Sequence, residues 1–386
     1  MVGGVGPRSA TRRGVILAPL VAAAAGACSS PANTGGAGGG LVSAGAPKPK
    51  FSRPPGNNQP AGRLMIVGDS ITQGSSGDFT WRYRLYKHLT ANHIPVTYVG
   101  PRTDLYNNVT NTQGDHSYAD RGFDQHHDSV WGRTMTQAKD TLPNEITGNR
   151  PDIVLVLLGI DDIGFGVADV EMTALNVRTL IINARGAKPD VRLILGKLLP
   201  TLHGASDPAF AASVAQVNRR VVEVAAEMSS AESPVFVADT GTDYAPSDDT
   251  WDGSHPNARG EVKIAAAFAD ALADGLGVGP RFERPLPVVP IGPRTVPALR
   301  ASTAGARGEI NLSWSLSPGT TGYWVLLRRP DLEADFTRLP YALNGTTSRW
   351  TAGMLAPGVV YEFKLQTTKG MAMGVFSNTV HATARA

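Results

Sequence analysis

The chain has 386 residues, 42% hydrophobic and 18% charged, with a formal net charge of +3. This length predicts two domains, and the composition is typical of a soluble globular protein. The excess positive charge lies in residues 1–27, which hold Arg8, Arg12 and Arg13 and no acid, so the remainder carries 33 basic and 33 acidic residues. Nothing in this balance suggests nucleic-acid binding, which would need a basic face, so we expect no nucleic-acid partner.

Residues 1–27 have the organisation of a signal peptide. The charged pair Arg12-Arg13 precedes an apolar run over 15–25 and small residues at a cleavage site. The apolar run is too short to span a bilayer. The arginine pair fits either a twin-arginine or an ordinary Sec signal. We therefore predict that the protein is exported.

Cys28 is the only cysteine of the chain and follows the apolar run directly. A lone cysteine is normally a core residue, but here no core surrounds it, and one cysteine forms no internal disulfide. Residues 25–28 resemble a bacterial lipobox, although Ala25 stands where Leu is usual. The resemblance implies a lipoprotein of the cell envelope, held at the outer face of the cytoplasmic membrane through Cys28. The alternative is a secreted protein without an anchor.

Residues 28–62 are rich in Gly, Pro, Ala, Asn and Ser, which predicts a disordered tether. From residue 63, strand-like and helix-like segments alternate. The continuous apolar run over 153–158 is typical of a central parallel strand buried on both faces. Apolar residues spaced four and three apart over 210–228 indicate an amphipathic helix. The other predicted strands are 64–67, 96–99, 191–195 and 235–237, and the other helices are 81–89 and 256–272.

This alternation predicts an α/β domain over 63–280, a three-layer sandwich in which helices cover both faces of an open parallel sheet. Ligands of such domains bind at the carboxyl ends of the strands. A Pro-rich linker follows at 281–293. Alternation with period two at 310–314 and 360–365 then predicts a small β-sandwich over 294–386.

The placing of Trp314, Tyr323 and Tyr361 in this last segment resembles a fibronectin type III domain. Tyr361 follows Leu355-Ala356-Pro357-Gly358, the setting of a tyrosine corner.

A candidate nucleophile, Ser70, lies in the segment Gly68-Asp69-Ser70-Ile71-Thr72-Gln73-Gly74, directly after the first predicted strand. The flanking glycines allow a sharp turn and close approach of a ligand. Its candidate partners lie 182 residues after Ser70, in Asp252-Gly253-Ser254-His255. Asp and His three apart in a turn can share a hydrogen bond, which leaves the other imidazole nitrogen free to take a serine proton.

Each segment alone is weak evidence for catalysis, because Gly-Asp-Ser is a common turn and Asp-x-x-His often caps a helix. Together they resemble the SGNH (GDSL-type) hydrolases, in particular the branch that includes acetyl xylan esterases. The resemblance covers roughly residues 63–276. It implies a flavodoxin-like fold, a Ser70–His255–Asp252 triad and no cofactor.

Two further segments match blocks of this family. Trp131-Gly132-Arg133-Thr134 resembles the block whose glycine amide, with the amide of Ser70, binds the oxyanion. Gly159-Ile160-Asp161-Asp162 resembles a block that normally reads Gly-x-Asn-Asp, in which the asparagine donates to the oxyanion. This chain has Asp161 instead.

The substitution has a chemical cost, because an ionised carboxylate has no donor. At about 4 Å it opposes the oxyanion by about 4 kcal/mol in an effective dielectric of about 20. A neutral Asp161 would still donate, and burial beside Asp162 would favour the neutral form. Two outcomes are open: the hydrolytic activity is weak and favoured by acid, or the oxyanion hole has another function.

Trp81 and Arg82 follow the Ser70 loop and are candidates for lining a sugar-sized pocket, although a Trp at a helix start is more often a core residue. His127 precedes the Gly132 block, as a histidine does in the related acetyl esterases, which implies a pocket-lining role. The cluster His126-His127-Asp128 lacks a third ligand at suitable spacing, so we predict no metal site.

These observations together predict a serine esterase acting on acyl esters, acetyl or another short chain, carried by a polysaccharide. Two alternatives stay open: a catalytically weak module that binds envelope glycan, and a hydrolase of lipid or thioester substrates. All motif residues precede residue 276, so we expect the C-terminal domain to act as a spacer or glycan attachment and to be dispensable for hydrolysis.

Overall fold

The computed structural model describes residues 60–386. The predicted signal peptide, Cys28 and nearly all of the predicted tether lie outside the described residues.

The first domain is built on a parallel sheet whose main strands follow the order β2-β1-β6-β7-β8, with a short strand, β5, paired to the end of β1. The strands are β1 Gly62–Gly68, β2 Val96–Val99, β5 Asp128–Ser129, β6 Ile153–Leu157, β7 Arg192–Gly196 and β8 Val235–Ala238. All five residues of β6 are buried. The continuous apolar run of the sequence is therefore the central strand, as predicted.

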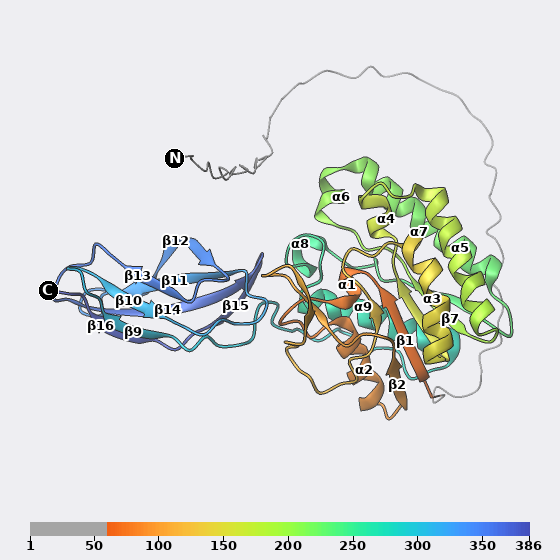
Figure 1. Ribbon diagram of the computed structural model, residues 1–386, viewed down its shortest axis with the longest axis horizontal. Coiled ribbons are helices and arrows are strands. Elements are labelled where there is room, and N and C mark those ends of the chain that lie inside the picture. Colours follow the sequence, from red (N-terminus) through yellow and green to blue (C-terminus); the bar gives the residue numbers. More distant parts are fainter. Residues whose placement is uncertain (1–59) are drawn as a thin grey trace, which may run out of the picture. The chain divides into compact units, whose positions relative to one another are not determined.

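Helices cover both faces of this sheet (Figure 1). One face carries α3 Met135–Asn149, α5 Val170–Ala187 and α7 Pro208–Met228, and the other carries α2 Trp81–Ala91 and α9 Ala258–Ala271. The pleat of β1 sends Met65 and Val67 into the first core and Leu64 and Ile66 into the second. The predicted three-layer α/β fold is confirmed.

Short elements follow the carboxyl ends of four strands and form the rim of the sheet. They are α1 Ser70–Gln73 after β1, α4 Ile160–Gly164 after β6, α6 Leu202–Ser206 after β7 and α8 Pro246–Asp249 after β8. A hairpin of β3 Leu105–Asn107 and β4 Thr112–Asp115 lies between β2 and α3 in the chain. In a parallel sheet this rim is where ligands bind.

The C-terminal domain is all-β and consists of antiparallel strands in two sheets. One sheet contains β9 Arg300–Thr303, β10 Ile310–Ser313 and β13 Arg349–Ala352; the other contains β11 Gly322–Arg328, β12 Thr337–Asn344, β14 Val360–Lys369, β15 Ala372–Phe376 and β16 Val380–Thr383. Trp314, Tyr323 and Tyr361 are buried in its core. The Ala356 amide donates to the Tyr361 hydroxyl at 3.0 Å, the contact expected of a tyrosine corner.

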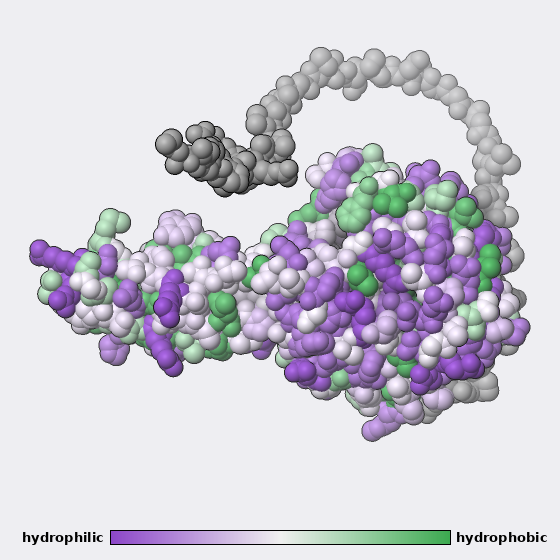
Figure 2. All heavy atoms as spheres, viewed as in Figure 1, coloured by the Kyte–Doolittle hydropathy of each residue, from purple (hydrophilic) through white to green (hydrophobic). Residues whose placement is uncertain are grey.

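Polar side chains dominate the face of the molecule shown in Figure 2, and apolar residues form small separate groups. Within residues 60–386, no helix combines the length and the apolar character needed to cross a bilayer.

Candidate active site

Ser70 is the first residue of α1, where the chain turns out of β1. The Asp69 side chain caps this helix by accepting from the Ile71 amide at 2.9 Å. Gly68 lies so close to Thr72 that a Cβ at position 68 would be 2.2 Å from the threonine hydroxyl, and Gly74 ends the helix at a φ of +75°. The two glycines thus permit a tight turn that fixes Ser70 at the rim of the sheet.

The structure brings the three predicted triad residues together. His255 Nε2 lies 3.0 Å from Ser70 Oγ, and His255 Nδ1 lies 2.7 Å from Asp252 Oδ2. The other oxygen of Asp252 accepts from the amides of Ser254 and His255 at 3.0 and 2.8 Å. This geometry lets His255 accept the Ser70 proton while Asp252 holds the imidazole in place.

Asp252 remains ionised in this setting. Burial alone would raise its pKa, but the hydrogen bond and charge of His255, with the two backbone amides, outweigh burial and lower the pKa below its usual value. An ionised Asp252 stabilises the imidazolium that forms when His255 takes the serine proton.

Two tryptophans stack on the His255 ring, a feature that no pattern in the sequence indicated. Trp131 stacks on His255 at 4.2 Å between ring centroids, and Trp251 does so at 5.5 Å, both with 21° between the planes. Tyr106 from the β3–β4 hairpin stacks on the other face of Trp131 at 4.3 Å. Stacking of this kind holds the His255 ring in one orientation.

Two backbone amides are available to bind an oxyanion. Among the described residues, no partner accepts from the amides of Ser70 or Gly132. Gly132 has a φ of +78°, and a Cβ there would meet nothing within 4 Å, so no neighbouring atom crowds this residue on its side-chain side. Gln73 fixes this loop from α1, because its side-chain oxygen accepts from the Trp131 amide at 2.7 Å.

The sequence pattern of the GDSL-like lipase/acylhydrolase family matches residues 66–262, half of the chain. The chain belongs to this family. This GDSL-like protein is therefore a serine ester hydrolase, and the matched range contains every residue of the arrangement described above.

Solved structures also resemble this GDSL-like hydrolase. A family 3 carbohydrate esterase from Talaromyces cellulolyticus is 27% identical, with a TM-score of 0.45, over 53% of this chain and 93% of the other. A family 3 carbohydrate esterase from Clostridium thermocellum is 24% identical, with a TM-score of 0.44, over 55% and 95%. A catalytic mutant of an acetylxylan esterase from Geobacillus stearothermophilus is 16% identical, with a TM-score of 0.42, over 58% and 100%. A search of curated proteins found no match.

Asp161, where the family resemblance expects asparagine, lies in α4. One of its carboxyl oxygens is buried and has no hydrogen-bond partner among the described residues. Burial raises the pKa of Asp161 to about 6; the charge of His255 opposes this rise and that of Asp162 adds to it. At neutral pH the carboxyl is therefore mostly ionised, and below pH 6 it is mostly a hydrogen-bond donor.

The neighbouring Asp162 has a structural role. It accepts from the amides of Met135 and Thr136 at 2.5 and 3.0 Å and from the Thr136 hydroxyl at 2.7 Å. It thereby joins the α4 segment to the first turn of α3 and supports the loop that carries Gly132.

The three residues expected to line a substrate pocket are instead core residues, and that expectation is wrong. Trp81, Arg82 and His127 are each 0% exposed. Trp81 stacks on Phe268 of α9 at 4.6 Å. A side chain with no accessible surface cannot contact a substrate in this state.

Arg82 and His127 stabilise the backbone of segments next to the site. The Arg82 guanidinium donates to the carbonyls of Thr72 and Gln73 at 2.9 and 3.0 Å, at the end of α1. One ring nitrogen of His127 contacts the Asp104 carbonyl at 2.9 Å, and the other accepts from the Ser129 amide at 3.0 Å. Burial keeps His127 neutral, because it lowers its pKa well below the usual value.

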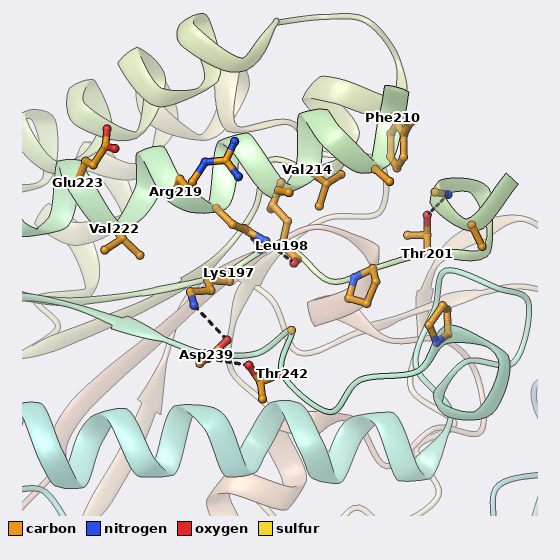
Figure 3. Close-up of a pocket in the computed structure, with 18 residues that line it drawn as sticks. Lys197, Leu198, Thr201, Phe210, Val214, Arg219, Val222, Glu223, Asp239 and Thr242 are labelled. Carbon is orange, nitrogen blue, oxygen red and sulfur yellow. Dashed lines mark hydrogen bonds and ion pairs between the residues drawn. The ribbon is translucent and has the colours of Figure 1, made fainter. Parts of the chain in front are cut away.

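A separate apolar cavity of about 870 Å³ opens beyond the ends of β7 and β8 (Figure 3). Phe210, Val214 and Val222 from one face of α7 line it together with the loops that hold Lys197 and Asp239. No triad residue lines this cavity. It is therefore not the place where an acyl carbonyl meets Ser70.

Proposed function

We propose that this GDSL-like hydrolase is an exported esterase that removes acetyl or other short acyl groups from carbohydrate. The chain of two hydrogen bonds from Ser70 through His255 to Asp252, at 3.0 and 2.7 Å, carries the proposal. The proposal that the acyl group is carried by carbohydrate rests on the resemblance of the Ser70, Gly132 and Asp161 segments to the acetyl xylan esterase branch.

In the proposed reaction, Ser70 Oγ attacks the acyl carbonyl carbon as its proton passes to His255 Nε2. The amides of Ser70 and Gly132 donate to the resulting oxyanion. The bond to the alcohol oxygen then breaks, and His255 returns the proton to the departing alcohol. Water next attacks the acyl carbon of the acyl-enzyme and gives a proton to His255. The bond between the acyl carbon and Ser70 Oγ then breaks, His255 returns the proton to Ser70 Oγ, and the acid leaves.

The test compares esters of increasing acyl length. We expect the purified protein to hydrolyse p-nitrophenyl acetate faster than the butyrate and octanoate esters and to release acetate from acetylated xylan. A preference for octanoate would favour the lipid-hydrolase alternative. No turnover of any ester at pH 5–8 would contradict the proposal and favour a glycan-binding module weakened by Asp161.

We also propose that the protein is anchored in the cell envelope through a lipid on Cys28. The sequence around Cys28 supports this, since residues 25–28 resemble a lipobox after an apolar run. Cys28→Ser is expected to move the protein from the membrane fraction to the soluble exported fraction, because acylation of Cys28 is the proposed anchor. Detergent partitioning measures this shift. Equal membrane retention by the variant would contradict a lipid anchor at this residue.

A further inference from the structure

The turn between β14 and β15 of the C-terminal domain contacts the loop that follows the nucleophile helix. Lys369, the last residue of β14, is only 5% exposed. Its ammonium group donates to the Ser76 carbonyl at 2.9 Å and to Asp78 Oδ1 at 2.6 Å. Asp78 in turn accepts from the amide and hydroxyl of Ser75 at 2.8 and 2.9 Å. The ion pair is thus linked through Asp78 to Ser75, which directly follows Gly74, the residue that caps the end of α1.

The same turn also contacts the loop of the acid–base pair. The Met371 amide donates to the Trp251 carbonyl at 2.7 Å. Gly370 approaches so closely that a Cβ there would lie 2.0 Å from the same carbonyl oxygen. The Lys369 ammonium lies 5.2 Å from the centroid of the Trp251 ring. Trp251 precedes Asp252 in the chain and stacks on His255.

A second segment of the C-terminal domain closes on the same region. A Cβ at Gly319 would lie 1.8 Å from the Ser76 carbonyl oxygen, and the Gly319 carbonyl accepts from the Asn108 side chain at 3.1 Å. Asn108 follows β3, whose middle residue, Tyr106, stacks on Trp131. The C-terminal domain therefore contacts the Trp251 loop and the β3–β4 hairpin as well as the nucleophile loop.

A buried lysine distinguishes these contacts from a simple surface tether. Lysine is almost never fully buried unless it is paired, because its charge loses hydration. Here the charge is paired with Asp78, whose side chain is 14% exposed. Such a pair demands a defined geometry, so it fixes the position of both loops relative to each other.

We propose that Lys369 and the turn 369–371 position the catalytic residues, so that the C-terminal domain completes the active site. The inference rests on the proposed triad. Lys369 touches no reacting atom and acts through Trp251 on the Asp252–His255 turn and through Asp78 on the loop after Ser70. The C-terminal domain, expected from the sequence to be dispensable for hydrolysis, is on this proposal needed for the full rate.

The test uses the full chain and two matched lysines of β14. Lys369→Met keeps an unbranched apolar stem and removes the charge. Lys364→Met is the control, because the Lys364 ammonium lies over Phe336 and Phe376 within the C-terminal domain itself. We expect Lys369→Met to lower kcat for p-nitrophenyl acetate about ten-fold with KM changed less than two-fold, since sub-ångström misplacement acts on the reaction step. Lys364→Met should match the wild type.

A pair of glycines tests the same contact without changing any charge. Gly370 and Gly358 both have a positive φ, +52° and +76°, but a Cβ at position 358 would meet nothing within 4 Å. Both alanine variants are therefore strained at the backbone, and only Gly370→Ala presses on Trp251. We expect a loss of kcat in Gly370→Ala that is absent in Gly358→Ala. This pair decides the question if Lys369→Met does not fold.

Hydrogen exchange measured by mass spectrometry gives a readout that needs no turnover. Peptides covering 75–78 and 250–255 should exchange faster in Lys369→Met and in Gly370→Ala than in their controls. Faster exchange with unchanged kcat would overturn the positioning role, as would unchanged exchange or an equal loss in the controls. A wild-type protein that hydrolyses no ester would instead overturn the proposed function, and exchange would still decide whether the turn holds these loops.

Discussion

Ser70→Ala is expected to lower kcat for short-chain esters by about a million-fold, the loss seen when one member of a serine triad is removed elsewhere. The variant removes the oxygen that forms the acyl-enzyme, and a water molecule in its place is a much weaker nucleophile. The fold should be unaffected, because Asp69 and the glycines that shape the turn remain. Steady-state assays with p-nitrophenyl acetate, together with thermal unfolding, measure both effects.

Two further variants make this result specific. His255→Ala should lose nearly as much activity, and the double variant little more, because groups that act as a unit are not additive. Ser213→Ala is the control, since its hydroxyl bonds the Ala209 carbonyl within α7 and lies outside the site; it should keep the wild-type rate. Hydrolysis by Ser70→Ala at the rate of the Ser213→Ala control would refute the triad assignment.

The sheet and its helices were predictable because each element has a strong local pattern. The buried run at 153–158 and the apolar stripe of 210–228 each correspond to one observed element, β6 and α7. The candidate triad was predictable because its residues lie in short segments at strand ends, and strand ends of a parallel sheet share one edge. The structure brings Ser70, His255 and Asp252 into contact, and their catalytic roles stay predictions that the variants above test.

What the sequence did not indicate depends on side-chain direction and on contacts between distant segments. Trp81 was expected in a pocket, yet Trp81, Leu85 and Leu89 recur every four residues and form the buried stripe of α2, a pattern that already favours the core. No comparable signal exists for Arg82, whose buried guanidinium donates to carbonyls of α1 and also to the Gln125 carbonyl and the Tyr118 hydroxyl. Lys369 is separated from Asp78 by 291 residues, and no local pattern pairs them.

Asp161→Asn is expected to change the pH dependence of catalysis. Burial raises the pKa of Asp161 to about 6, so the wild-type side chain loses its donor as the pH rises through this value. The wild-type kcat should therefore fall as the pH rises through about 6. The asparagine amide donates at every pH, so the variant should not show this fall.

At pH 8 the variant should be faster than the wild type by about ten-fold or more, given what a single oxyanion-hole donor contributes. Asp140→Asn is the control, because the Asp140 side chain is 65% exposed and the variant removes the same charge from the surface. Its pH–rate profile should match the wild type. An Asp161→Asn profile identical to both would mean that Asp161 points away from the oxyanion and that backbone amides alone form the hole.

Stability provides a second test of the same titration. A raised pKa means that the folded protein prefers neutral Asp161, so this contribution to stability is complete below pH 3.8 and is lost as the pH rises through about 6. A rise of this size corresponds to about 3 kcal/mol, or about 2 kcal/mol after allowing for partial exposure. Asp161→Asn lacks this loss. The free energy of unfolding of the variant, measured with urea, should therefore rise relative to that of the wild type between pH 4 and pH 8. A gain in stability without a change in the pH–rate profile would mean that the Asp161 carboxyl titrates but does not affect the reaction. Both changes together would mean that its ionisation affects the binding of the oxyanion.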